Sequence, residues 1–369
     1  MKRSRAGHAS SKNFFLNNHK REDGKMLNVK VIVARTPGKV TMETAELDEN
    51  TLRPDHILVK TLYSAVSAGT ECAWISGNAN NPGQAFPFYP GYSAVGRVVK
   101  VGSDVKNFAV GDAVIAPWGG HRSYIMSPAA PVWKGAHKIA DSRVNLKDAS
   151  IAHIASFPML GVRRLKIQMG ESVMIAGLGI LGQIAIQAAK YSGAAPVFGC
   201  DFSPERRELA LKLGADAVFD PRDPDFTEKL YAANGGKKIN AVVEVTGKAA
   251  ALKQALSYTA KMGRISLLGC TRVPDCPIDF YRDVHLPGIT LIGAHTSNRP
   301  ATESRPGEWS EHDDYEVILK YLATGRFDFA SLIHKTLSPA DCTPLYDTLL
   351  HEPDPPMGIV FDWNLLKED

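Results

Sequence analysis

The chain has 369 residues, of which 44% are hydrophobic and 22% charged, and this composition excludes a disordered or fibrous protein. A chain of this length can bury a large core and divide into two domains. The net charge of +4 comes from residues 1–25, which hold seven Lys or Arg and two acidic residues, while the rest holds 36 basic and 37 acidic residues. Because the body of the chain is nearly neutral, no nucleic-acid partner is expected.

Residues 1–26 are expected to form a flexible extension before a natural start near Met26. This segment lacks the apolar core of a signal peptide, and its Arg and Ser content resembles a transit peptide, although Glu22 and Asp23 count against that interpretation. The five cysteines are scattered along the chain without a Cys-x-x-Cys pair. This usage suits a reducing cytoplasm and offers neither a disulfide framework nor a four-cysteine metal site.

From residue 29 to about residue 118, alternating apolar residues predict a largely antiparallel β domain. The predicted strands are HILVKTLYSAV (56–66), GYSAVGRVVKV (91–101) and DAVIAPW (112–118), with turns at Pro37-Gly38, Gly102-Ser103 and Gly111-Asp112. Between the first two strands lies SAGTECAW (67–74), which holds a hydroxyl, a carboxylate and a thiol at consecutive positions. It can be a metal site, a metal site that has lost its metal, or a turn.

After about Ser150, strands alternate with helices, which predicts a parallel, doubly wound sheet. The predicted strands are VMIA (173–176), PVFGCD (196–201), AVFD (217–220), AVVEVTG (241–247), RISLLG (264–269) and ITLIGA (289–294). Helices are predicted from about Leu181 to Gly193, from Ser203-Pro204-Glu205 onward, and near 313–323, before a final strand at 357–363. Residues 172–189 are apolar over the length of a bilayer helix, but their glycines and glutamines favour a buried strand-turn-helix, and no membrane association is expected.

GLGILG at 177–182 is a glycine motif that follows a strand and opens a helix. Gly177 permits a tight turn, Gly179 lets the backbone approach a pyrophosphate, and Gly182 lets the helix pack closely on the sheet. The helix N-terminus then offers unpaired N–H groups to phosphates. The alternative is a glycine-rich strand-turn-helix without a ligand.

Asp201 ends the next strand, 24 residues after Gly177, where its carboxylate can accept both hydroxyls of an adenine ribose. The same carboxylate repels a 2′-phosphate, so NAD is expected rather than NADP. Arg206 and Arg207 could partly offset that repulsion, or could lie on a solvated helix.

These residues have a counterpart in a known family. A GroES-like β domain, then GLGILG with AK at 189–190 and GA at 193–194, Asp201 with Arg206, VTG at 245–247 and GRISLLG at 263–269 resemble the medium-chain dehydrogenase/reductase superfamily. The resemblance implies an α/β fold, with a GroES-like catalytic domain from residues 27–152 and 295–369 and a Rossmann domain from residues 153–294. It also places the active site in the cleft between them.

The resemblance further implies cofactor contacts at positions along the second domain. These are Gly177, Gly179, Ile180, Leu181, Gly182, Asp201, Arg206, Val245, Thr246, Leu268 and His295.

Zinc alcohol dehydrogenases of this superfamily carry Cys-Gly-Thr-Asp, then Gly-His-Glu, then a third ligand before the Rossmann strand. This chain has Ala68 at the first ligand position, Tyr92 at the second and Ala152 near the third, and none of these side chains can hold zinc. The four-cysteine structural lobe is also absent, and Cys72 is expected to be an inert thiol. The S-x-G-T-E variant at 67–71 together with PGYSAVG at 90–96 resembles a narrower zinc-free group that includes the bacteriochlorophyllide hydroxyethyl dehydrogenase-like proteins.

The resemblance favours a zinc-independent, NAD-linked oxidoreductase that acts on a secondary alcohol or ketone of small-molecule size. One alternative is an enone or quinone reductase that uses NAD(P)H, and another is a catalytically silent cofactor-binding protein. Without zinc, protein groups must polarise the oxygen and move its proton.

Thr70 stands where the family has its proton-relay hydroxyl, although it could simply bond the turn backbone. Tyr92 replaces a zinc ligand, so its phenol is expected to point into the cleft, unless it is a packed aromatic. Glu71 matches a family acid that braces the site through an Arg. The expected catalytic residues are Thr70, Tyr92, His121 and His153.

Histidines are the natural bases near neutral pH, and oxidation is expected to accelerate with pH through a histidine-like ionisation. His121 lies in the loop that replaces the zinc lobe and is the first candidate; His153 is the second. Each of these, like His295, could instead be structural or solvated. A shifted metal site built from Glu71, His121 and His153 is conceivable, but no metal is expected.

Residues 296–312 form a long polar segment, in which Arg299, Trp309 and His312 could shape a substrate pocket. The strand ITLIGA, preceded by the Pro-rich segment 273–288, matches the edge strand through which family members pair. A homodimer is therefore expected.

Overall fold

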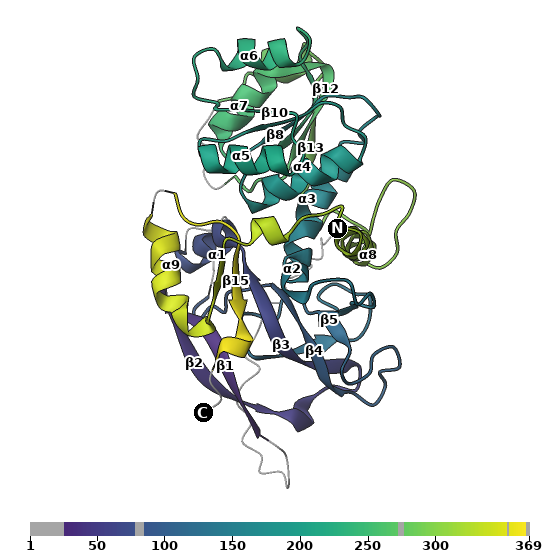
Figure 1. The fold of residues 1–369 in the computed structure, drawn as a ribbon, viewed down its shortest axis with the longest axis vertical. Helices are drawn as coiled ribbons and strands as arrows, with labels where there is room; N and C mark the ends of the chain where they lie inside the picture. Colours follow the sequence, from purple (N-terminus) through teal and green to yellow (C-terminus); the bar gives the residue numbers. More distant parts are fainter. Residues whose placement is uncertain (1–25, 78–84, 272–276, 353, 367–369) are drawn as a thin grey trace, which may run out of the picture.

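A computed structural model describes residues 26–77, 85–271, 277–352 and 354–366, so the expected extension lies, apart from Met26, outside the described residues. The described chain forms two lobes, each built on its own β-sheet (Figure 1). One lobe is rich in antiparallel strands and the other is a parallel sheet covered by helices. The α/β fold class predicted from the sequence is confirmed.

The first lobe contains a seven-stranded sheet with the order β14-β15-β3-β4-β5-β7, and β6 pairs with β3 outside this path. Its strands are β3 (His56–Val66), β4 (Ser93–Val101), β5 (Ala113–Ile115), β6 (Tyr124–Pro128), β7 (His137–Lys138), β14 (Lys335–Leu337) and β15 (Ile359–Asp362). The pairs are antiparallel except for β14 with β15. Because β14 and β15 come from the end of the chain, segments far apart in sequence build this lobe.

A two-stranded hairpin stands beside this sheet. Its strands β1 (Met26–Thr36) and β2 (Lys39–Asp48) join at the predicted Pro37-Gly38 turn. Gly38 has a φ of +74°, a backbone conformation that glycine adopts without steric cost.

The second lobe contains a six-stranded parallel sheet with the order β10-β9-β8-β11-β12-β13. Its strands are β8 (Val173–Ala176), β9 (Val197–Cys200), β10 (Ala217–Phe219), β11 (Ile239–Glu244), β12 (Thr259–Leu267) and β13 (Thr290–Gly293). The chain starts in the middle at β8, runs outward to β10, and then returns to β11 on the other side. In such sheets, ligands bind beyond the carboxyl ends of the strands where the order reverses.

The helices connect these strands or return the chain between the lobes. They are α1 (Ala68–Ile75), α2 (Leu146–Ala149), α3 (Ala152–Arg164), α4 (Ile180–Tyr191), α5 (Pro204–Lys212), α6 (Phe226–Ala233), α7 (Ala249–Tyr258), α8 (Glu311–Ala323) and α9 (Cys342–His351). Short helical turns span Glu49–Thr51, Phe280–His285, Ala330–Leu332, Pro339–Asp341 and Trp363–Leu365. As predicted, Ser203 caps α5, and its hydroxyl accepts the Arg206 N–H.

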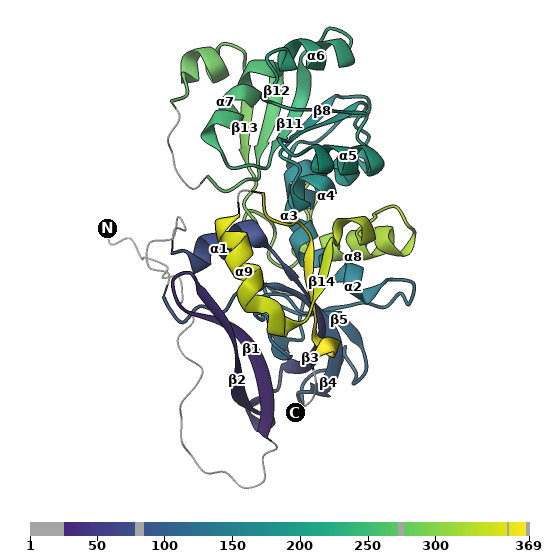
Figure 2. The same cartoon turned by 60° about the vertical axis from the view of Figure 1, so that its left-hand side comes forward.

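Both faces of the parallel sheet are buried, which explains why its strands are continuous apolar runs. On β8, Val173 and Ile175 belong to a core shared with α3 and α4, whereas Met174 and Ala176 pack with residues of α6 and α7. Figure 2 shows α4 and α5 on one side of this sheet and α7 on the other.

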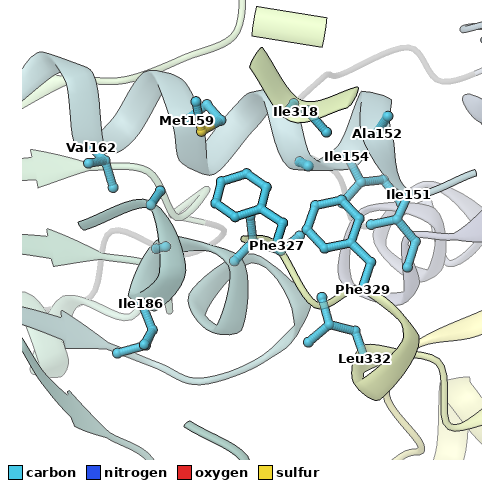
Figure 3. Close-up of a cluster of buried hydrophobic side chains, with 14 of the residues drawn as sticks. Ile151, Ala152, Ile154, Met159, Val162, Ile186, Ile318, Phe327, Phe329 and Leu332 are labelled. Atoms are coloured by element: carbon cyan, nitrogen blue, oxygen red, sulfur yellow. The ribbon is translucent and has the colours of Figure 1, made fainter. Parts of the chain in front are cut away.

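Helix α3 ties the two lobes together. Most residues of α3 are buried. Several of them belong to a hydrophobic cluster that also includes Ile115 of the first sheet and Val173 of the second. Figure 3 shows side chains of α3 facing Ile186 of α4, Ile318 of α8 and the ring of Phe327. A continuous apolar core therefore fixes the side chains at the start of α3 relative to both sheets.

The apolar segment 172–189 divides into β8, a turn and most of α4, as predicted. Within the described parts of the chain, no helix is both long and apolar enough to span a membrane. The stretch SAGTECAW is not an ordinary turn, because residues 68–74 belong to the short helix α1 and Ser67 is its N-cap.

Candidate active site

The glycine motif occupies the turn between β8 and α4, and each glycine has a distinct steric reason. Gly177 has a φ of +97°, and a Cβ there would lie 2.8 Å from Thr246 Cγ2. A Cβ on Gly182 would lie 1.9 Å from the Gly177 carbonyl oxygen, whereas a Cβ on Gly179 would meet no atom within 4 Å. The turn is therefore closely packed at Gly177 and Gly182, and it is open at Gly179. Ile180 and Leu181 then begin α4.

Asp201 follows β9 and turns its carboxylate toward this motif. Its Oδ2 accepts the N–H of Leu178 at 2.8 Å, and its Oδ1 accepts the N–H of Ser203 at 3.0 Å. Arg206 is turned away to Asp354, with 2.9 Å between Nη2 and Oδ1, and Arg207 donates to the Asp201 carbonyl at 2.6 Å. The Asp201 carboxylate is thus held beside the glycine turn, while the Arg206 guanidinium forms its ion pair with Asp354.

The other expected cofactor residues lie at the carboxyl ends of β11, β12 and β13, the sheet edge that also carries the glycine turn. Glu244, the buried last residue of β11, accepts the Thr246 N–H at 2.8 Å and the Gly247 N–H at 3.1 Å. These two hydrogen bonds hold the turn that follows Val245. Burial raises the pKa of Glu244.

The last two expected cofactor residues, Leu268 and His295, lie beside this edge of the sheet. Leu268 packs over Gly161 of α3, where a Cβ on the glycine would lie 3.3 Å from Leu268 Cδ2. His295 is exposed after β13 and bonds the Ser297 hydroxyl through Nδ1 at 2.7 Å.

In the first lobe, Tyr92, which stands where the resemblance implies a zinc ligand, comes together with Thr70, which stands where it implies the proton-relay hydroxyl. Tyr92 is only 3% exposed, donates its hydroxyl to Ser67 Oγ and is also hydrogen-bonded to Thr70. Burial raises the pKa of Tyr92, so the phenol keeps its proton. The Tyr92 ring also packs against His153 and Phe157 of α3, the helix that joins the two lobes.

Glu71 is fully buried beneath α1 and organises a hydrogen-bond network. Its Oε1 accepts the Ser67 N–H at 2.9 Å, and its Oε2 receives the Tyr346 hydroxyl and lies 3.2 Å from His121 Nε2. The expected bracing role therefore has partners in this structure, but they are a tyrosine and a histidine rather than an arginine.

His121, the first candidate for the base, points into the lobe in this structure. Its side chain is 0% exposed, and its Nδ1 lies 2.8 Å from the Ser64 hydroxyl while Nε2 faces Glu71. The backbone explains this orientation: the His121 N–H bonds the Pro90 carbonyl at 2.7 Å, which turns the imidazole into the lobe. Both ring nitrogens have hydrogen-bond partners inside the lobe, so His121 belongs to the network of Glu71.

His153 follows Ala152 at the start of α3 and lies among aromatic rings. The ring centroids of Tyr92, Trp118 and Phe157 lie 5.6, 5.4 and 5.1 Å away, each edge to face. Its Nδ1 is 2.6 Å from the Tyr315 hydroxyl, whereas its buried Nε2 has no hydrogen-bond partner. Burial lowers the pKa of His153 to about 3, with further lowering by Arg299 and His312, so the ring is neutral.

Trp118 was not among the expected site residues. Its ring stacks on Tyr92 at 5.3 Å, its buried indole N–H has no partner, and its φ of 61° is rare for a bulky residue. Such strain persists where the surroundings hold a side chain in place, as at functional sites. The sequence signal was its position at the end of the DAVIAPW strand.

The described residues do not fit a zinc ion at this position. Ala68 offers no ligand, Tyr92 is bonded to hydroxyl groups, and burial raises the pKa of the Cys72 thiol to about 12. In residues 26–77, 85–271, 277–352 and 354–366, no three His, Cys, Asp or Glu side chains gather where they could hold a metal. The shifted site of Glu71, His121 and His153 is therefore not formed.

The segment 296–312 is anchored to α3. Arg299 donates to the Ser156 carbonyl at 3.1 Å, and Trp309 lies under the Arg163 guanidinium at 3.8 Å. His312 opens α8 beside His137, with 3.2 Å between their Nδ1 atoms. These side chains hold the segment against the core that carries His153.

Several partners in the site could not be found from the sequence because they come from distant segments. Tyr315 and Glu311 reach His153 from α8, and Tyr346 reaches Glu71 from α9. Ser67 lay within the quoted SAGTECAW stretch, but its contact with Tyr92 depends on the fold.

Comparison with known proteins gives the same assignment for both lobes. The family profile "Alcohol dehydrogenase GroES-like domain" matches residues 53–137, and "Zinc-binding dehydrogenase" matches residues 181–311. The D-guloside 3-dehydrogenases of Shigella flexneri and Escherichia coli (strain K12) are each 26% identical over 339 residues, which cover 86% of this chain and 95% of theirs. The L-threonine 3-dehydrogenase of Caldanaerobacter subterraneus subsp. tengcongensis is 29% identical over 277 residues, 65% of this chain and 76% of that protein.

The fold is also shared with solved structures. A protein from Sinorhizobium meliloti 1021 with NADP bound superposes with a TM-score of 0.76 at 19% identity, covering 91% of this chain and 99% of that one. Together, the two family profiles and these relatives show that the protein is an oxidoreductase of the zinc-type alcohol dehydrogenase family within the medium-chain dehydrogenases.

Proposed function

We propose that this protein is a zinc-independent, NAD(H)-dependent oxidoreductase that transfers hydride between a nicotinamide and a secondary alcohol or its ketone. The observation that carries the proposal is the buried, unpartnered Nε2 of His153, surrounded by Tyr92 and Trp118, where the ligand positions of the family hold Ala68, Tyr92 and Ala152. A buried polar atom without a partner is rare and marks a place where a ligand can complete the bonding.

The residues around the glycine motif fit a dinucleotide. Open space above Gly179 and the N-terminus of α4 suit the pyrophosphate, and Asp201 lies beside this turn where a ribose would follow. When bound, the nicotinamide supplies the acceptor for the hydride that leaves the alcohol carbon.

The proton chemistry falls to the chain's own side chains. A neutral His153 can accept the hydroxyl proton at Nε2, because its lone pair is not used by any other group. The indole N–H of Trp118 can donate to the substrate oxygen, and Tyr92 with Thr70 provides a second set of hydroxyl groups nearby. Hydrogen-bond donors would then take the polarising role that zinc has in relatives.

An alcohol substrate is supported by relatives named for the dehydrogenation of D-gulosides, L-threonine and sorbitol. The zinc-free group with the bacteriochlorophyllide hydroxyethyl dehydrogenase-like proteins remains our proposed placement within the family, on the basis of Ala68, Tyr92 and Ala152. We also propose a cytoplasmic location, because the four cysteines in the described ranges are unpaired thiols.

NAD is expected to bind at least about tenfold more tightly than NADP, because the Asp201 carboxylate faces the position of the 2′-phosphate and Arg206 is paired with Asp354. Asp201→Ala should narrow this difference, and fluorescence titration with both cofactors measures it. The control Asp225→Ala, at an exposed carboxylate of the same lobe, should leave the ratio unchanged. Equal or tighter NADP binding by the wild-type protein would count against the assignment.

We propose a homodimer that pairs through β13. This strand lies at the edge of the parallel sheet, and its residues Thr290 and Gly293 are exposed. An unpaired edge favours pairing with a second copy across a two-fold axis. Residues 273–276 of the preceding Pro-rich segment lie outside the described residues. Light scattering at micromolar concentration should give the mass of two chains, and a single-chain mass contradicts the proposal.

The test of the proposed function is NADH formation, followed by absorbance, from a panel of polyols, sugars and aryl alcohols by protein freed of metal with a chelator. Reduction of enones or quinones with no alcohol oxidation would instead assign an enone or quinone reductase.

A further inference from the structure

We propose that Tyr315 and Glu311 of α8 are positioning residues that hold His153 in the tautomer with a free lone pair at Nε2. This inference rests on the proposed function, in which that lone pair accepts the substrate proton. It concerns a helix whose Tyr315 lies 162 residues after His153 in the sequence and that no motif marks.

The contact between His153 and Tyr315 is short and fully enclosed. The Nδ1 atom lies 2.6 Å from the Tyr315 hydroxyl oxygen, and both residues are 0% exposed. Water does not compete for either group at such a site, so the tyrosine decides which ring nitrogen carries the hydrogen.

Tyr315 has one hydrogen to donate, and Glu311 competes for it. Glu311 stands beside this pair, with its Oε1 3.6 Å from His153 Nδ1 and its carboxyl group in reach of the Tyr315 hydroxyl, and an ionised carboxylate can only accept. The hydroxyl hydrogen therefore points to Glu311, and the tyrosine oxygen accepts from His153 Nδ1–H. A neutral imidazole with its hydrogen on Nδ1 has its lone pair on Nε2, the atom that lacks a partner.

This arrangement also gives the substrate proton a balanced route. As the hydride leaves the alcohol carbon for the nicotinamide of the proposed function, the O–H bond breaks, its electron pair completes the C=O bond, and its proton bonds to His153 Nε2. The Nδ1 proton can then pass to the Tyr315 oxygen while the Tyr315 proton passes to Glu311. The ketone and a protonated Glu311 result, and His153 and Tyr315 are again neutral.

Positively and negatively charged side chains lie around His153, Tyr315 and Glu311. Arg299 Nη1 lies 3.8 Å from Glu311 Oε1 and 3.5 Å from Asp314 Oδ2, and Asp314 also pairs with Arg163 at 2.8 Å. Arg299 favours the ionised form of Glu311, although burial has the larger effect and raises the pKa of Glu311. A carboxyl group with a raised pKa is suited to receiving a proton.

Ser156 and His312 complete the enclosure. The Ser156 hydroxyl lies 3.5 Å from Glu311 Oε1, and the ring of His312 stands edge to face against Tyr315 at 5.6 Å. Burial lowers the pKa of His312, so it adds no positive charge near neutral pH.

The experiment reads the tautomer directly by ¹⁵N NMR of histidine-labelled protein at pH 7, with the His153 signals assigned from His153→Gln. The wild-type protein should show a protonated Nδ1 and an unprotonated Nε2. Tyr315→Phe and Glu311→Gln should each shift His153 toward the tautomer protonated at Nε2. Turnover should fall between about ten and about 10⁴-fold, because the lone pair no longer faces the substrate.

Tyr258→Phe is the matched control, because Tyr258 is equally buried in the core between the sheet and α7. It should leave both the His153 tautomer and turnover unchanged. A wild-type His153 protonated at Nε2, or a tautomer that both α8 variants leave unchanged, overturns this inference. Absence of NADH formation from every alcohol overturns the proposed function instead, and the NMR result is read independently of it.

Discussion

Replacing His153 with glutamine is expected to lower the turnover of alcohol oxidation by about two to four orders of magnitude, while NAD affinity stays unchanged. Glutamine keeps a polar side chain of similar length but has no basic nitrogen to accept the hydroxyl proton. The imidazole lies among the rings of Tyr92, Trp118 and Phe157, away from the glycine turn that suits the dinucleotide. Steady-state kinetics and a fluorescence titration with NAD measure the two quantities.

His351→Gln is the matched control, because this histidine is 70% exposed on α9. It should retain the wild-type turnover. If His153→Gln also retains most of its activity, the base lies elsewhere, and Tyr92 and His295 become the candidates to replace.

The pH profile expected from the environment of His153 differs from the profile expected from the sequence. Burial lowers the pKa of His153 from 6.5 to about 3, so the neutral form that accepts a proton is present at all pH values well above 3. Between about pH 5 and pH 9, the oxidation rate should therefore show no ionisation of His153. A rise centred near the ordinary histidine pKa would assign the base to a different group.

Replacing Glu71 with alanine is expected to lower the free energy of unfolding by about 3–5 kcal/mol. The carboxylate is 0% exposed and accepts from the Ser67 N–H and the Tyr346 hydroxyl while it faces His121 Nε2. Alanine leaves these buried groups without an acceptor, and each unsatisfied group carries its own desolvation cost. Denaturant unfolding measures the change.

Glu46→Ala is the matched control, at an exposed position of β2, and should change stability by less than about 0.5 kcal/mol. Glu71→Gln should fall between the two variants, because an amide oxygen can still accept one of the bonds. Equal unfolding midpoints for Glu71→Ala and Glu46→Ala would mean that the network does not stabilise this lobe.

The parts of the structure that the sequence predicted are those set by local geometry. Gly177 and Gly182 are required by one turn and the helix that follows it, so the spacing of the glycines between an apolar run and a helical pattern predicted the strand-turn-helix. Alternation of apolar residues likewise predicted β3 at its observed bounds. In both cases the residues that determine the local structure lie within a dozen positions of one another.

The partners of the candidate catalytic groups could not be predicted in this way. His153 meets a tyrosine 162 residues further along the chain, and this contact depends on how α8 packs on α3. The inward orientation of His121 depends on a backbone bond to Pro90. The sequence marked both histidines as candidates, and only the fold distinguishes the one with a free nitrogen.

We propose that this member of the family oxidises alcohols with protein groups in place of zinc. The most direct measurement compares the zinc content of the purified protein with its rate of NADH formation before and after dialysis against a chelator. We expect less than about one-tenth of a zinc per chain and an unchanged rate, because Ala68, Tyr92 and Ala152 offer no zinc ligand set. One zinc per chain, with activity that is lost in chelator and restored by added zinc, would contradict it.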